Sequence, residues 1–109
     1  MKECKFKFSK DQLETLAFYI GRLVDAEPHT INEALIYSVF AKLWEKLQVK
    51  LIRLHKPKCT ISFNTTESLA MLLYFNGQLP NLEVDSYLGN LILTIRDQIA
   101  QTYSDLKTT

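Results

Sequence analysis

Hydrophobic and polar residues alternate in two short stretches of the chain. Residues 5–8 read Lys-Phe-Lys-Phe, and residues 59–63 read Cys-Thr-Ile-Ser-Phe. A period of two is typical of a half-buried strand, because successive side chains of a strand point to opposite faces. Two short strands are therefore predicted, and the first carries Cys4, Phe6 and Phe8 on its buried face.

Apolar residues elsewhere recur every three or four positions, which is the spacing of one helix face. This spacing predicts four helices, over residues 10–24, 31–55, 68–75 and 83–106. Three helix starts are marked by a polar residue followed three positions later by Gln or Glu, the capping-box pattern: Ser9–Gln12, Thr30–Glu33 and Asn64–Glu67. Pro57 prevents the second helix from continuing, and the Asn76–Gly77 pair is a stop signal for the third.

The apolar faces of these elements predict a hydrophobic core. The residues expected to be largely buried in it are Phe8, Leu16, Ile20, Ile36, Phe40, Leu43, Leu47, Phe63, Leu72, Leu88, Leu91 and Ile95. Residues 69–75 are apolar on every side of a helix, so that segment must either be central in the fold or be covered by a partner.

The order strand, helix, long helix occurs twice, with an offset of about 55 residues. We therefore expect a mainly α fold with a small β ribbon, of the α+β class. Two strand–helix–long helix units would be related by a pseudo-twofold axis, with four helices packed under a two-stranded antiparallel ribbon. The expected organisation is a single domain, residues 1–109, with a candidate internal repeat of residues 1–56 and 57–109. Chance similarity between two amphipathic units is the alternative to a true repeat.

The antiparallel ribbon has a specific register in this scheme. It places Phe6 opposite Ile61 and Cys59 opposite Phe8, so that Cys4 and Cys59 lie about 14 Å apart along the ribbon. A disulfide requires Cα atoms within roughly 7 Å. We therefore expect two free thiols, whereas a parallel pairing in the same register would bring the two cysteines together.

The composition is that of an ordinary globular protein. The 109 residues are 47% hydrophobic and 23% charged, which suffices for one core. A membrane span needs about 20 apolar residues, but the longest unbroken apolar run covers only residues 69–75. Residues 1–10 contain no apolar signal segment. Two cysteines without an export signal are typical of reduced thiols, so we expect a cytoplasmic protein that does not enter the membrane.

The sequence contains no motif for a catalytic, cofactor or metal site. It lacks glycine-rich phosphate loops and the HExxH and CxxC patterns, and its two histidines are His29 in a turn and His55 near a helix end. A nucleophilic triad converges only in the folded chain, and no spacing here favours one. We therefore expect no enzyme activity, no cofactor, no metal and no small-molecule substrate.

Basic residues are concentrated in two segments. Residues 1–10 and 50–58 hold eight of the 13 basic side chains and one acid, Glu3, which gives these segments a net charge of +7. The rest of the chain holds five basic and eleven acidic side chains, a net charge of −6. If the two strands pair, one face of the ribbon presents Lys5, Lys7, Lys58, Thr60 and Ser62.

A two-stranded ribbon fits the major groove of DNA, so this face is a candidate nucleic-acid site. The order strand, helix, helix resembles the ribbon-helix-helix family of DNA-binding proteins, in which two chains each donate one strand. The resemblance implies a base-reading side made of Lys5, Lys7, Thr60 and Ser62. This chain differs from the family in its longer second helices. It also has acids near the helix starts where the family holds phosphate, namely Asp25, Glu27, Glu83 and Asp85.

Protein–protein contact is the leading functional prediction. The apolar segment of residues 69–75 favours a binding or regulatory module that associates with itself as a homodimer, or with another protein. Nucleic-acid binding through the ribbon is the alternative function. Each has a purely structural counterpart, because the apolar segment can be buried within the chain, and lysines on an exposed ribbon prevent edge-to-edge pairing.

Overall fold

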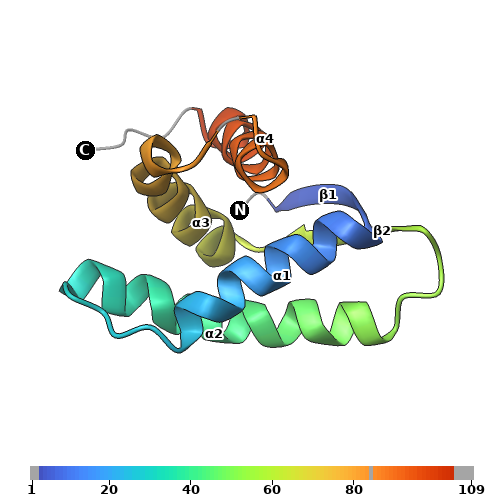
Figure 1. Ribbon diagram of the computed structural model, residues 1–109, viewed down its shortest axis with the longest axis horizontal. Coiled ribbons are helices and arrows are strands. Elements are labelled where there is room, and N and C mark those ends of the chain that lie inside the picture. The colour runs from blue at the N-terminus through green and yellow to red at the C-terminus, as the bar shows by residue number, and fades with distance from the viewer. Residues whose placement is uncertain (1–2, 84, 105–109) are drawn as a thin grey trace. The chain divides into compact units, whose positions relative to one another are not determined.

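Four α-helices and two strands follow one another in the residues that the structure describes. This computed structural model describes residues 3–83 and 85–104 (Figure 1). The elements are β1 (Cys4–Ser9), α1 (Lys10–Val24), α2 (Ile31–Ile52), β2 (Lys58–Phe63), α3 (Thr65–Gln78), the 3₁₀ turn η1 (Leu79–Asn81) and α4 (Tyr87–Thr102). The two strands form an antiparallel sheet, which confirms the predicted α+β class.

The chain divides into two compact units. Residues 5–62 form the first unit, and the described residues from Phe63 to Ser104 form the second together with Cys4. In the first unit α1 packs along α2, and the two helices run in opposite directions (Figure 1). In the second unit α3 packs against α4. The pseudo-twofold relationship between the two halves stays a prediction.

One backbone hydrogen bond beside the ribbon bears on its register. The Lys10 N–H donates to the carbonyl oxygen of Pro57 over 3.2 Å. In an unbroken antiparallel ladder, this bond agrees with Phe8 opposite Cys59 and Phe6 opposite Ile61. The antiparallel direction of the two strands is confirmed, and the pairing of individual residues stays a prediction. Cys4 and Cys59 are free thiols.

Two of the three predicted capping boxes are complete. Ser9 and Gln12 exchange hydrogen bonds at the start of α1, and Asn64 and Glu67 do so at the start of α3. Such reciprocal bonds satisfy backbone N–H groups that have no partner within the helix. These two caps explain why a helix follows each strand immediately.

The box predicted at the start of α2 is only half formed. Thr30 accepts the Glu33 N–H over 3.0 Å, but the Glu33 carboxylate accepts the N–H of His29 instead of that of Thr30. Its other oxygen accepts a hydrogen bond from the Tyr37 hydroxyl over 3.3 Å. The Glu33 carboxylate therefore links the loop before α2 to Tyr37, one turn further along the same helix.

The helix ends show where local signals were overridden. The first helix has the predicted bounds, but α2 ends at Ile52, three residues before the predicted end. The third helix runs through Gly77 to Gln78, so the stop predicted at Asn76–Gly77 is wrong. No glycine among the described residues has a positive φ, the conformation that such a stop requires. The fourth helix begins at Tyr87 after the cap Ser86, and part of its predicted end lies outside the described residues.

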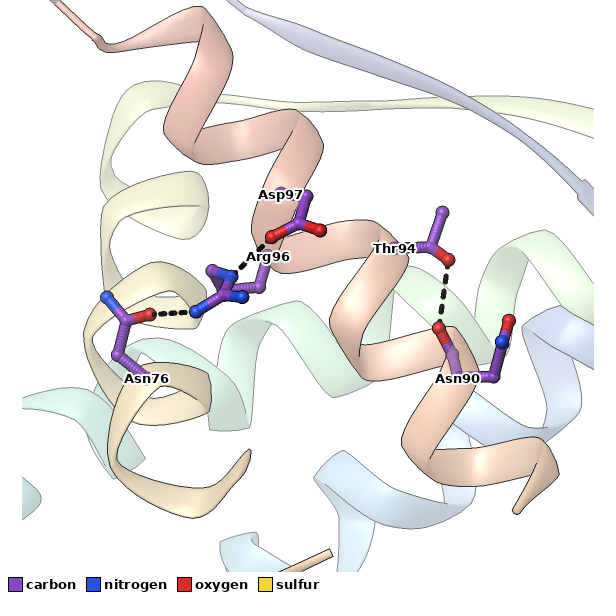
Figure 2. A network of polar contacts seen from close by, with 5 residues as sticks. All are labelled: Asn76, Asn90, Thr94, Arg96 and Asp97. Carbon is purple, nitrogen blue, oxygen red and sulfur yellow. Dashed lines mark hydrogen bonds and ion pairs between the residues drawn. The ribbon is translucent and has the colours of Figure 1, made fainter. Parts of the chain in front are cut away.

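A polar network joins the two helices of the second unit. Figure 2 shows Arg96 on α4 donating to the Asn76 amide oxygen on α3 over 3.0 Å and to Asp97 over 2.7 Å. In the same view the Thr94 hydroxyl donates to the Asn90 carbonyl oxygen one turn earlier. Asn76 therefore contributes to helix packing, although the sequence presented it as a helix terminator.

The predicted core is largely confirmed. Ten of the twelve predicted residues are buried, and Phe40, Leu43, Leu47, Phe63 and Ile95 are fully so. Ile36 and Leu88 are half-buried instead. Both lie in the first two turns of their helices.

Candidate interaction groove and basic ribbon

An apolar groove lies between α1 and α2 within the first unit. Its volume is about 450 Å³. The residues that line it, here called the α1–α2 groove, are Glu14, Ala17, Phe18, Gly21, Arg22 and Asp25 from α1 and its C-terminal cap, and Trp44, Gln48 and Leu51 from α2. On α2 these positions are three or four residues apart, and on α1 they recur at the same spacing as single residues or adjacent pairs, so each helix contributes one face.

Gly21 determines how closely the two helices meet in this groove. A Cβ atom placed on Gly21 would lie 2.6 Å from Nε1 of Trp44 and 3.0 Å from its Cδ1. The indole of Trp44 therefore occupies the space that any side chain at position 21 would need. Trp44 itself remains half-buried, so part of the indole stays accessible from solvent.

Phe18 is the most unusual side chain of the groove. It is 71% exposed, although a phenyl ring loses about 1.5–3 kcal/mol of transfer free energy by staying in water. Its neighbours one turn away on the same helix are the charged Glu14 and Arg22, both exposed. An exposed aromatic ring beside an apolar groove with a charged rim is the arrangement found at protein interfaces.

The groove lining does not include the other exposed apolar side chains of this unit. Leu35 is 66% exposed and precedes Trp44 by nine residues, which places it on the opposite side of α2 at about 100° per residue. Ile31, Val49 and Ile52 are exposed as well. Leu35 therefore serves as a matched reference for Phe18, since both are large, apolar and exposed on a helix surface.

The apolar segment of residues 69–75 is mostly accounted for by burial. Ala70, Met71, Leu72 and Phe75 are buried, whereas Leu73 is 63% exposed. Self-association through this segment stays a prediction, and the α1–α2 groove is a second apolar surface that the sequence did not indicate. The groove was missed because Phe18 falls outside the regular apolar stripe of α1. The available signal was the isolated Gly21 inside a helix, since such a glycine often marks close packing.

The ribbon presents the predicted polar residues on one face. Lys5, Lys7, Lys58 and Thr60 are exposed, while Ser62 is half-buried. They alternate with the buried residues Phe6, Phe8, Ile61 and Phe63, as the period of two requires. We call this set of five residues the basic ribbon face. The Ser62 carbonyl oxygen accepts a hydrogen bond from the Lys46 ammonium group, which brings a further basic side chain of α2 to the end of β2.

Among the described residues, no three His, Cys, Asp or Glu side chains come close enough to hold a metal ion. Tyr19 on α1 has its pKa raised above 10.0, mainly because burial disfavours the phenolate, with a further contribution from the neighbouring Tyr37. Within the described residues no helix combines the length and the apolar character that crossing a membrane would need.

Comparisons with protein-family models, with curated proteins and with solved structures found no match to this chain.

Proposed function

We propose that this chain is a non-enzymatic, cytoplasmic binding module that associates with a second copy of itself through the α1–α2 groove. The observation that carries the proposal is the exposure of Phe18 directly beside an apolar groove that contains Trp44. Covering Phe18 removes an aromatic ring from water, and a nearby indole offers it an aromatic contact.

The expected stabilisation can be bounded from this one side chain. A twofold dimer buries Phe18 twice, which contributes about 3 kcal/mol at the lower end of the transfer scale. Removing both rings should therefore weaken association by about a hundredfold, since each 1.4 kcal/mol corresponds to about tenfold. Because Phe18 is exposed in the single chain, its replacement should leave the fold intact.

Sedimentation equilibrium on two matched variants tests this proposal. Phe18→Ser should raise the dimer dissociation constant by about a hundredfold, while Leu35→Ser should leave it within about threefold of the original value. Equal effects of the two substitutions would show that the groove is not the interface. Far-ultraviolet circular dichroism of both variants checks that the helices are retained.

Nucleic-acid binding is a second candidate function, favoured by the one-sided basic ribbon face. Three lysines and a threonine are exposed on it, and phosphate contacts by lysines supply most non-specific affinity for nucleic acids. The exposed acids near the start of α2, Asp25 and Glu27, oppose this function because they repel phosphate from the helix start.

Fluorescence anisotropy with a short DNA duplex distinguishes the second candidate. If the basic ribbon face binds DNA, affinity should fall steeply with salt, and Lys7→Glu should weaken binding much more than Lys42→Glu on α2. The two substitutions make the same charge change on exposed lysines. Equal losses of DNA affinity in the two variants would show that net charge, and not the basic ribbon face, determines binding. If the original chain does not bind DNA at low salt, nucleic-acid binding is ruled out as its function.

A further inference from the structure

The charges around Phe18 are arranged in a way that matches a second copy of the same helix. Glu14, Phe18 and Arg22 are each four residues apart on α1 and lie on one face of it. Phe18 is the midpoint, with the acid about 6 Å before it and the base about 6 Å after it along the helix axis. The nearest charged neighbour of the aromatic ring on this face is therefore an acid on one side and a base on the other.

We infer that the second copy docks with its α1 antiparallel to α1 of the first, so that a twofold axis passes beside Phe18. This inference rests on the proposed function. A twofold axis pairs each residue before Phe18 with the equally distant residue after it. Glu14 of each copy then faces Arg22 of the other, which gives two equivalent ion pairs, and each Phe18 lies over the apolar groove of its partner.

The same charges disfavour the competing alignment. If the two α1 helices were parallel, Glu14 would face Glu14 and Arg22 would face Arg22, which places like charges together. The charges therefore favour the antiparallel alignment of the two α1 helices over the parallel one. The existing contact of Glu14 with Lys10 is a weak competitor, because those atoms are 3.9 Å apart and both side chains are more than half exposed.

One pair of charges opposes the antiparallel alignment. Asp11 and Asp25 lie seven residues before and after Phe18, so they face each other across the axis at both ends of the interface. They stand about 10 Å from Phe18 along the helix. Both are exposed, so water and salt screen their repulsion. The inner pairs of Glu14 with Arg22, beside the buried rings, are screened less and determine the alignment.

Charge reversal tests this geometry by sedimentation equilibrium. Glu14→Arg and Arg22→Glu should each raise the dimer dissociation constant by about tenfold, because each creates two like-charge contacts. The double variant Glu14→Arg/Arg22→Glu re-forms both ion pairs with their signs exchanged, so its dissociation constant should return to within about threefold of the original. Lys42→Glu, which makes the same charge change as Arg22→Glu on the far side of α2, should leave the value unchanged.

The outcomes separate this inference from the proposed function. If Phe18→Ser abolishes the dimer but the single reversals have no effect, the groove is the interface and the antiparallel alignment is wrong. The alignment is also wrong if the double variant stays as weak as the single ones. If the original chain remains a monomer at every concentration, both the inference and the proposed function are overturned.

Discussion

Gly21 of α1 and Trp44 of α2 touch so closely that a Cβ atom at position 21 would lie 2.6 Å from the indole nitrogen. This contact sets the spacing of the first helix pair, and it also places the indole at the side of the apolar groove. Packing within the unit and the accessible surface of the groove therefore depend on the same two residues.

The first prediction is that Gly21→Ala destabilises the fold. Alanine gains up to about 1 kcal/mol of helix propensity, but overpacking against the indole costs about 1–3 kcal/mol. The net effect should be a lower midpoint of urea unfolding. Gly77→Ala is the matched control, because a Cβ atom there meets nothing within 4 Å. It should leave the midpoint unchanged or raise it, and a stabilised Gly21→Ala would show that the indole moves aside freely.

Gly89→Ala should be more damaging than Gly21→Ala. Gly89 donates its N–H to the cap Ser86 over 2.9 Å, and a Cβ atom there would lie 2.0 Å from the backbone oxygen of Glu83. A backbone atom cannot rotate away as a side chain can, so the loop before α4 must shift. We expect a loss of about 2–3 kcal/mol in the free energy of unfolding, measured by urea titration. An unchanged midpoint would mean that this loop packs differently.

Phe40→Ala should create a cavity in the core of the first unit. Phe40 on α2 is completely buried, so its truncation should cost about 3–5 kcal/mol. Leu35→Ala, five residues earlier and 66% exposed, should cost less than about 0.5 kcal/mol. Thermal midpoints of the two variants check the prediction, and similar values for both would show that the buried face of α2 is assigned wrongly.

Ionisation of the Tyr19 phenol should destabilise the fold at alkaline pH. Burial and the nearby Tyr37 raise its pKa above 10.0, so the folded chain retains the phenolic proton longer than the unfolded chain does. The stabilisation is fully present below pH 10 and is lost as the pH rises through the higher folded value. Tyr19→Phe should lose part of this alkaline dependence in urea titrations. An identical pH profile for the variant would contradict the raised pKa.

Local sequence patterns predicted the helices and strands more accurately than they predicted the exposed α1–α2 groove. Ser9 with Gln12 marked the start of α1, because capping acts over three residues and is visible in the sequence. Asn64 with Glu67 also form the expected cap, but α3 begins at Thr65 and not at the predicted residue 68. The helix end predicted at Gly77 was wrong, because a glycine cap of this kind requires a positive φ and Gly77 does not adopt one. The groove depends on Gly21 meeting Trp44, two residues 23 positions apart, and no local pattern encodes such a contact.

The emission of Trp44, the single tryptophan of the chain, tests the central claim most directly. The indole lines the groove and is half-buried in the single chain, so a second copy docked there must remove it further from water. We predict that the emission of the original chain shifts to shorter wavelength as concentration rises and the mass grows beyond 12.6 kDa. The Phe18→Ser variant should show no such shift. A doubling of mass without any change in Trp44 emission would contradict the groove as the interface, and a constant mass would contradict self-association itself.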